Sequence, residues 1–268
     1  MKKKRLIPVL LLKNGSLVQS RGFSRFQKIG SPITAVKRLS EWSSDELIYL
    51  DISRDDKYDL NRDDLKFVNS SNILDIISYI SKQTFMPITI GGKIKNLKDI
   101  EVRLEKCADK VSINTESFKN KEFIKNATRE FGSQCIVASI DAKKVEDQYK
   151  VFIDRGKINT GADVDEWIKI LQDLGVGEIL LNSIDMDGTG SGYDLKLVSK
   201  IEKIVKVPLI ICGGVGSYSD FKKGLEFKKV DAVAAANIFH YRDQSVFYAK
   251  KELYEAGCNV RNPSILKI

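Results

Sequence analysis

The sequence contains two copies of one segment, and this internal repeat limits the possible folds more than any other feature. Residues 86–118 read MPITIGGKIKNLKDIEVRLEKCADKVSINTESF, and residues 207–239 read VPLIICGGVGSYSDFKKGLEFKKVDAVAAANIF. Pro87 matches Pro208, and Asp109 matches Asp231. Two copies with this spacing nearly fill the 268 residues. The period is far longer than the ~20–50 residues of a solenoid repeat, so we predict two halves of one domain.

Short apolar runs alternate with segments of helical periodicity along both halves. We predict strands at residues 6–12, 47–50, 87–90, 111–113, 136–140, 179–181, 209–211 and 232–235. Apolar residues at helical spacing follow each run, as Ile33, Val36 and Leu39 follow the first. Eight such units predict an α/β protein with a single (β/α)8 TIM barrel over residues 1–268. Its half-barrels would span about residues 1–131 and 132–255, followed by a short C-terminal tail.

Composition excludes several classes of protein. Hydrophobic residues make up 43% of the chain, enough for a full core. No apolar run approaches the ~18–20 residues of a membrane span, and no export signal stands near the start, so we expect a cytoplasmic protein with no membrane partner. The net charge of +8 comes from lysines and arginines mixed with acidic residues. This mixing argues against a nucleic-acid partner and suits a phosphorylated small molecule.

Cysteine and histidine usage limits the chemistry. The four cysteines have no CxxC spacing, and His240 is the only histidine. We therefore expect neither a metal site nor a cofactor, and no Ser-His triad. The chemistry must depend on carboxylates, amides and backbone groups.

Candidate site residues follow from the rule that TIM barrels place their active sites at the carboxyl ends of the strands. The candidate residues at or just after the predicted strand ends are Asp51, Asn114, Thr115, Asp141, Asp185, Asp187, Gly188, Gly213, Gly214, Ala236 and Asn237. Asp141 follows an apolar strand whose low-dielectric surroundings favour a raised pKa, so it is the candidate general acid or base. The alternative is a helix cap or loop carboxylate.

Two Gly-Gly turns occupy matching places in the repeat, at residues 91–92 and 213–214. Glycines let backbone N–H groups approach phosphate oxygens closely. Corners at Gly92 and at Gly213 and Gly214 would together hold a ligand with a phosphate at each end. Ordinary turn punctuation is the alternative.

Several segments resemble the cyclase subunit of imidazole glycerol phosphate synthase, the HisF family. They are ADKVSINT at 108–115, FGSQC at 131–135, IDAK at 140–143, GEILL at 177–181 and DMDGTGSGY at 185–193. The resemblance covers nearly the whole chain. It implies a complex with a HisH-like glutaminase, whose ammonia crosses the barrel to a bis-phosphorylated aminoimidazole carboxamide nucleotide.

The resemblance also assigns roles at the amino end of the barrel. The family's ammonia gate is a ring of four charged residues, matched here by Arg5, Glu46, Lys110 and Glu178. Structural salt bridges are the alternative explanation of this ring. Asp109 matches a position that the family uses to dock its glutaminase.

At the carboxyl end the sequence departs from the family. Asp141 matches one of two catalytic aspartates, but the other falls at Leu11, which cannot transfer a proton. Further departures are Gln19, Lys93 in place of a phosphate-loop glycine, Asn182, Cys212 and Asn237. The charged loop at residues 53–71 is longer than the family's and is expected to overhang the barrel mouth.

The charged ring matches the family, whereas the cyclase site is altered. In this combination the chain resembles the divergent paralogues linked to surface-polysaccharide biosynthesis. We therefore expect a barrel that receives ammonia and passes it on for amidination of a sugar, with a third amidotransferase protein at the carboxyl end. The alternatives are a working cyclase of histidine biosynthesis and a non-catalytic scaffold that activates a glutaminase. A sugar-phosphate isomerase on the same plan fits the segments at 112–115 and 185–193 less well.

Overall fold

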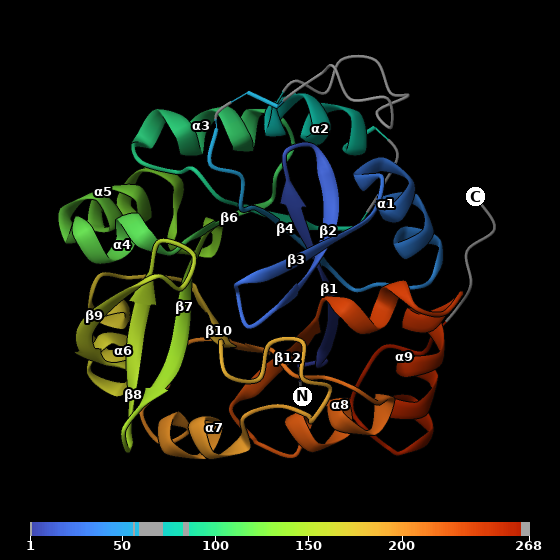
Figure 1. Ribbon diagram of the computed structural model, residues 1–268. Coiled ribbons are helices and arrows are strands. Elements are labelled where there is room, and N and C mark those ends of the chain that lie inside the picture. The colour runs from blue at the N-terminus through green and yellow to red at the C-terminus, as the bar shows by residue number, and fades with distance from the viewer. Residues whose placement is uncertain (1, 56, 59–71, 83–85, 264–268) are drawn as a thin grey trace.

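The computed structural model describes residues 2–55, 57–58, 72–82 and 86–263, and in them eight parallel strands close into a barrel (Figure 1). The strands in spatial order are β1 (Arg5–Lys13), β4 (Leu47–Asp51), β5 (Ile88–Gly91), β6 (Lys110–Ile113), β7 (Ile136–Val145), β10 (Glu178–Ser183), β11 (Leu209–Cys212) and β12 (Val230–Ala235). β12 pairs with β1, and β7 pairs with β10, so the sheet is continuous around the barrel. The predicted TIM barrel is confirmed.

Helices cover the outside of the barrel between successive strands (Figure 1). They are α1 (Pro32–Glu41), α2 (Ile73–Ile80), α3 (Leu97–Glu105), α4 (Thr115–Lys119), α5 (Lys121–Phe131), α6 (Val164–Asp173), α7 (Leu195–Ile201), α8 (Tyr218–Leu225) and α9 (Ser245–Glu255), with short 3-10 turns η1 (Ser133–Cys135) and η2 (Asn237–His240). Each long helix buries an apolar stripe, as α6 does with Trp167, Ile168 and Leu171. Within the described ranges, no helix combines the length and the apolar character needed to cross a membrane.

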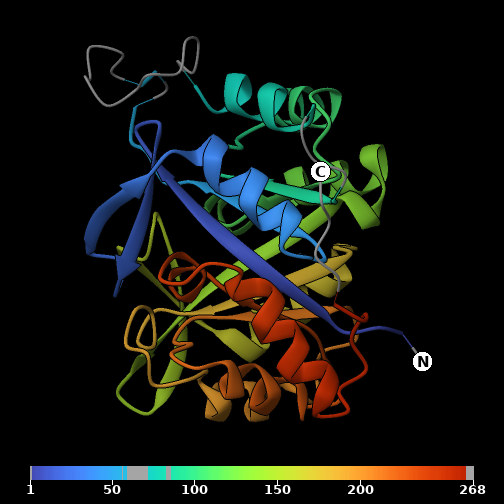
Figure 2. The ribbon, with the colours of Figure 1, turned by 90° about the vertical axis from the view of Figure 1, so that its right-hand side faces the viewer.

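Two antiparallel hairpins extend from the carboxyl end of the barrel, and the sequence analysis missed both. The first is β2 (Ser16–Arg21) with β3 (Arg25–Gly30), and the second is β8 (Gln148–Ile153) with β9 (Ile158–Asp163). They continue β1 and β7, the first strands of the two predicted halves. β7 therefore runs beyond Asp141, where we expected it to end. Figure 2 shows β2 and β3 at the end of the barrel opposite the N-terminus.

Alternation along the strands separates an inner core from an outer one. Ile7 and Val9 on β1 point inward and pack with Ile48, Val137 and Leu180 in the barrel interior. Their neighbours on β1, such as Leu6 and Leu10, pack against the helices instead. The apolar interior thus separates the two ends of the barrel. The two-half organisation stays a prediction from the repeat.

A buried ion pair attaches α9 to the amino end of the barrel. The Lys250 ammonium donates to Asp45 Oδ1 at 2.6 Å and to the Ser43 carbonyl at 2.8 Å, while Asp45 Oδ2 accepts the Leu6 N–H at 3.0 Å. The Lys250 and Asp45 side chains are only 1% and 3% exposed. Removing one partner would leave a buried charge without compensation.

We predict that Lys250→Met lowers the free energy of unfolding by about 3–5 kcal/mol. Lys251→Met is the matched control, because Lys251 is half exposed and lies 3.7 Å from Glu255. Its expected cost is below about 0.5 kcal/mol. Urea unfolding followed by circular dichroism measures both, and equal costs would contradict the proposed importance of the buried pair.

Candidate functional site

A closed ring of four charged side chains stands at the amino end of the barrel. Glu46 and Glu178 each bridge the same two cations, Arg5 and Lys110. The Lys110 ammonium lies 2.9 Å from Glu46 Oε1 and 2.8 Å from Glu178 Oε2. Arg5 donates a hydrogen bond from Nη1 to Glu46 and another from Nη2 to Glu178. Thr89 also donates its hydroxyl hydrogen to Glu46 at 3.0 Å. The structure thus brings together all four residues predicted for the gate.

Mutual compensation keeps the ring charged. Burial alone lowers the pKa of Lys110, but the charges of Glu46 and Glu178 outweigh it and raise that pKa above its ordinary value. Burial alone would raise the pKa of Glu46, whereas Arg5 and Lys110 lower it below its ordinary value. Every charge in the ring faces two of opposite sign, so the ring is stable at neutral pH.

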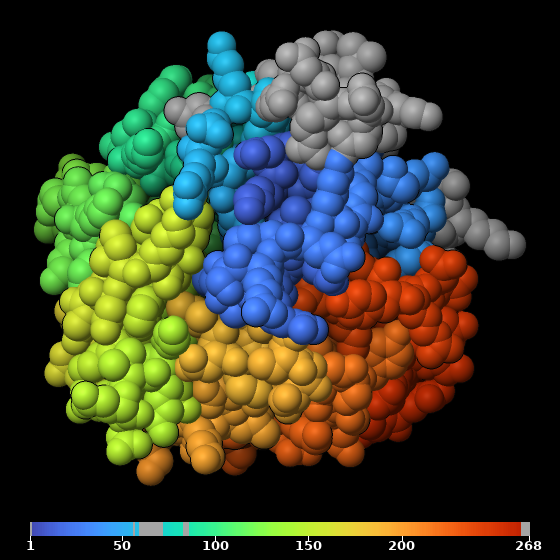
Figure 3. All heavy atoms as spheres, viewed as in Figure 1, coloured from blue at the N-terminus to red at the C-terminus, as the bar shows by residue number. Residues whose placement is uncertain are grey.

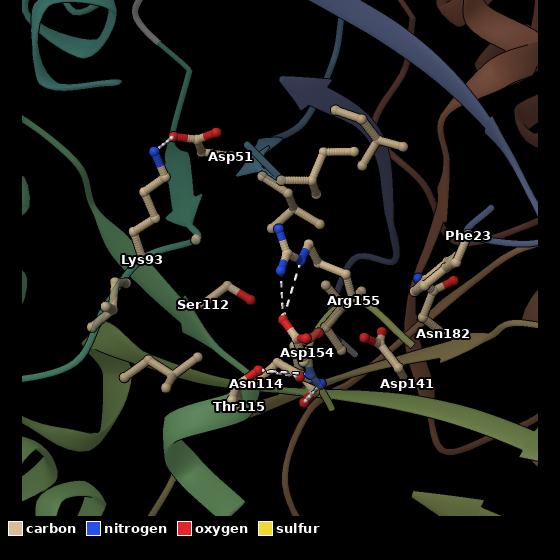
Figure 4. Close-up of a pocket in the computed structure, with 18 of the residues that line it drawn as sticks. Phe23, Asp51, Lys93, Ser112, Asn114, Thr115, Asp141, Asp154, Arg155 and Asn182 are labelled. Carbon is tan, nitrogen blue, oxygen red and sulfur yellow. Dashed lines mark hydrogen bonds and ion pairs between the residues drawn. The ribbon is translucent and has the colours of Figure 1, made fainter. Parts of the chain in front are cut away.

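A cavity of about 420 Å³ opens at the other end of the barrel (Figure 4). Val9, Leu11, Leu50 and Leu180 give it an apolar floor. A second cavity of about 320 Å³ adjoins it, and both are lined by Asp187, Cys212 and Ala236. Figure 3 shows the hairpin of β2 and β3 beside that of β8 and β9 over this end of the molecule.

Asp141 lines the larger cavity and is 8% exposed. β7 holds it next to Asn182 on β10, with which it is in register (Figure 4). The pKa of Asp141 is raised to about 7, mainly by burial, with a smaller contribution from the charge of Asp187, while a hydrogen bond with the Asn182 side chain opposes the shift. A carboxyl group with a pKa near the working pH can both give and accept a proton, which suits a general acid or base.

Leu11 lies on the floor of the same cavity, two residues beyond Val9 on the inward face of β1. It is paired with Leu50 on β4 and with Val18 on β2. The floor therefore carries a hydrocarbon at the position that the family resemblance assigns to a second aspartate. Asp141 faces this floor without a second carboxylate from β1.

The first predicted phosphate corner combines backbone and side-chain groups. Gly92 has a φ of +98°, and an added Cβ would lie 2.1 Å from the Asp51 carbonyl oxygen, so a larger residue does not fit. Asn114 and Thr115 line the cavity beside it, and Thr115 accepts the Asp154 N–H at 3.0 Å. Lys93, with a φ of +55°, extends to Asp51 at 3.5 Å (Figure 4).

Asp51 is enclosed by its own neighbours. Its side chain is fully buried, accepts the Tyr58 hydroxyl at 3.0 Å and the Ser53 N–H at 2.9 Å, and faces Lys93. Arg103 supports the turn from behind by donating to the Gly92 carbonyl at 2.9 Å. These contacts fix the corner from the protein side. Most of the long charged loop, residues 56 and 59–71, lies outside the described residues.

The second predicted corner lies in the smaller cavity. Its lining includes Gly188, Gly213, Gly214, Ala236 and Asn237. The Asn237 side chain donates to the Ser20 carbonyl at 2.8 Å, which ties this corner to β2. The two predicted corners thus lie in adjoining cavities rather than in one.

The remaining acidic candidates occupy different places. Asp187 lines both cavities, and it also accepts the Ser20 hydroxyl at 2.6 Å and the Phe23 N–H at 3.1 Å, which holds the first hairpin. Asp185 is exposed and accepts the Lys144 N–H at 2.7 Å, so the structure does not bring it into either cavity. Asp109 is exposed at the amino end and accepts the Ile88 N–H at 2.8 Å.

The sequence analysis missed the residues that the hairpins and β6 bring to the larger cavity. They are Phe23, Phe26, Ser112, Asp154 and Arg155. The sequence did carry a signal for the turn between β1 and β2, because Asn14-Gly15 is the strongest short hairpin motif. Nothing in the sequence told where the hairpin tips would lie.

Among the residues that the structure describes, no three His, Cys, Asp or Glu side chains converge as a metal site would require. Burial raises the pKa of the Cys212 thiol to about 12, and Asp187 adds to the shift, so the thiol is neutral. Burial and the charge of Arg38 lower the pKa of His240 to about 4. Of these three buried groups, Asp141 has the pKa that lies nearest neutral pH.

Comparison with known proteins identifies the family to which this barrel belongs. Residues 5–245 match the model of the histidine biosynthesis protein family. The imidazole glycerol phosphate synthase subunit HisF of Hydrogenobaculum sp. (strain Y04AAS1) is 40% identical over 259 residues, covering 96% of this chain and 98% of that protein. The HisF subunits of Bacillus cereus (strain G9842) and Clostridium botulinum (strain Okra / Type B1) are 39% and 37% identical with the same coverage. The chain belongs to the HisF family.

We predict that the free energy of unfolding of the wild-type protein, compared with that of Asp141→Asn, falls as the pH rises from about 4 to about 7. Over this range the folded chain, with its raised Asp141 pKa, binds more protons than the unfolded chain, so deprotonation favours unfolding. Above pH 7 the difference between the two free energies of unfolding levels off. Each unit by which the pKa of Asp141 in the folded chain exceeds that in the unfolded chain contributes about 1.4 kcal/mol. Urea unfolding of both proteins across the pH series measures it, and a carboxyl carbon of Asp141 that titrates near pH 4 by NMR would refute the prediction.

Proposed function

We propose that this chain is the barrel subunit of a glutamine amidotransferase complex, in which ammonia from a HisH-like glutaminase enters at the charged ring and leaves at the carboxyl end. The ring is intact in all four residues, Arg5, Glu46, Lys110 and Glu178. Above it the barrel interior is apolar, a medium that favours neutral ammonia over ammonium. An inlet and an apolar path are what such a function requires.

One observation carries the proposal about the acceptor, namely Leu11 on the cavity floor opposite Asp141. A hydrocarbon side chain cannot move a proton, and loss of a general acid or base typically costs about 10²–10⁴-fold in rate. We infer that the ammonia is used on a different acceptor, for amidination of a surface-polysaccharide sugar. A third amidotransferase protein at the carboxyl end would carry out that step.

The second candidate is a working cyclase of histidine biosynthesis. The relatives are named imidazole glycerol phosphate synthase subunit HisF, and the matching family is described as a histidine biosynthesis protein. Identity of about 40% over nearly the whole chain favours it, as does Asp141 with its raised pKa. This candidate requires Asp141 to serve as both acid and base. A scaffold that only activates a glutaminase is the third possibility, and it predicts that Asp141→Asn leaves the output of the complex unchanged.

Leu11→Asp tests the role of the floor. We expect it to gain at least ~10² in formation of imidazole glycerol phosphate from the bis-phosphorylated nucleotide and ammonium salt, because it restores the second carboxylate. Leu50→Asp is the matched control, since Leu50 pairs with Leu11 and lines the same floor but is not the family's catalytic position. Equal gains, or no gain in a Leu11→Asp protein with an unchanged urea midpoint, would contradict the account.

Asp109→Asn tests the docking of the glutaminase. The substitution removes a charge but keeps an oxygen that can accept the Ile88 N–H. We expect association with the cognate HisH-like subunit to weaken about tenfold in sedimentation experiments, within the range found for interfacial charge pairs. Asp231→Asn is the control, because Asp231 is the matching residue of the repeat and accepts the Leu209 N–H in the same way. Equal effects of the two substitutions would remove Asp109 from the interface.

A further inference from the structure

The tip of the second hairpin places a guanidinium group in the larger cavity. Arg155 stands between β8 and β9 with a φ of +61°, and both Arg155 and Asp154 line the cavity. Figure 4 shows Arg155 in the middle of the view, with Lys93 and Asp51 on one side and Asp141 and Asn182 on the other. Phe23, from the first hairpin, packs on the same tip, since an added Cβ on Gly156 would lie 2.9 Å from its ring. The hairpin tip that carries Arg155 is therefore in contact with the first hairpin.

Arg155 has few partners among the described residues. Its Nε and Nη2 atoms lie 3.2 Å and 2.7 Å from a single oxygen, Oδ1 of Asp154. A guanidinium carries five N–H donors, so this neighbour satisfies only part of its capacity. Both side chains are about one-third exposed, at 32% for Arg155 and 38% for Asp154. A pair of this kind between sequence neighbours is weak and can be replaced by another oxyanion.

A second group in the same cavity lacks a partner. Ser112 is 3% exposed, and its Oγ has no hydrogen-bond partner in the part of the chain that the structure describes. Its hydroxyl points toward the side of the cavity where Arg155 lies (Figure 4). Lys95 and Lys119 add positive charge to the lining. A buried hydroxyl without a partner and a half-satisfied guanidinium line the same cavity, and both can donate to oxygens of a ligand that enters it.

We propose that Arg155 and Ser112 form an oxyanion site that binds a phosphate or carboxylate group of the acceptor, with Arg155 as the specificity-determining residue. The site uses side chains, unlike the backbone N–H groups of the two glycine corners. On binding, the ligand oxygens replace Asp154 at the guanidinium. The inference rests on the proposed function only in placing the acceptor in this cavity.

The test is an anion titration of ¹⁵N-labelled protein at constant ionic strength. The Arg155 Nε–H signal, identified by its absence from Arg155→Lys, and the Ser112 amide signal report on the larger cavity and not on the smaller one with Gly213 and Gly214. Inorganic phosphate is expected to shift both. Acetate in a parallel titration separates the two sources, because the anion that binds more tightly indicates a phosphorylated or a carboxylate-bearing acceptor.

Three variants complete the test. Arg155→Met should raise the phosphate concentration at half-saturation, read from Ser112, by about tenfold or more. Lys157→Met, the matched control, removes the same charge from an exposed position on the same hairpin and should change it less than about twofold. Asp154→Asn should lower it about three- to tenfold, because it removes the internal competitor for Arg155, which a merely structural role would not predict.

Failure to shift the Arg155 signal with either anion, or equal effects of Arg155→Met and Lys157→Met, would overturn the oxyanion site. An Asp154→Asn protein that binds phosphate no more tightly would also overturn it. The titration uses neither glutaminase nor ammonia. A negative result here therefore leaves the docking of the glutaminase and the role of Leu11 to be judged by their own experiments.

Discussion

The structure depends on the two-residue alternation of side chains in a closed parallel barrel. Once β12 pairs with β1, every second side chain of each strand must point into the barrel. On β1 the inward column runs from Arg5 through Ile7 and Val9 to Leu11, and on β10 it runs from Glu178 through Leu180 to Asn182. The charged ring, the apolar interior and the cavity floor therefore belong to the same strands in the same phase, and a shift by one residue would destroy all three.

This constraint explains why the two ends can differ in chemistry. The ring satisfies its own charges, since each carboxylate bridges both cations, and it needs nothing from the carboxyl end. At that end burial raises the pKa of Asp141, while Leu11 contributes a hydrocarbon side chain to the floor. The apolar layer between them lets a substitution on the floor leave the ring unchanged. The hairpins then add groups such as Arg155 that the barrel strands do not supply.

The barrel itself could be predicted because each strand and helix has a local apolar pattern, and the repeat confirmed their order. Residues at strand ends, such as Asp141 and Asn114, could be predicted for the same reason. Asp185 was also a candidate, but its carboxylate accepts the Lys144 N–H outside the cavities. The pairing within each hairpin is local in sequence, but where the tips lie depends on contacts between the two hairpins, such as Phe23 on Gly156. Arg155 and Ser112 could not be assigned without that packing.

The central claim is that the protein takes in ammonia at an intact ring but lacks the carboxylate needed to cyclise the nucleotide. The most direct measurement compares the wild-type chain with Bacillus cereus HisF, one of its relatives, at saturating ammonium salt and equal concentrations of the bis-phosphorylated nucleotide. We predict that formation of imidazole glycerol phosphate by this chain is slower by at least ~10². Turnover equal to that of the relative would contradict the claim and establish the protein as a working cyclase.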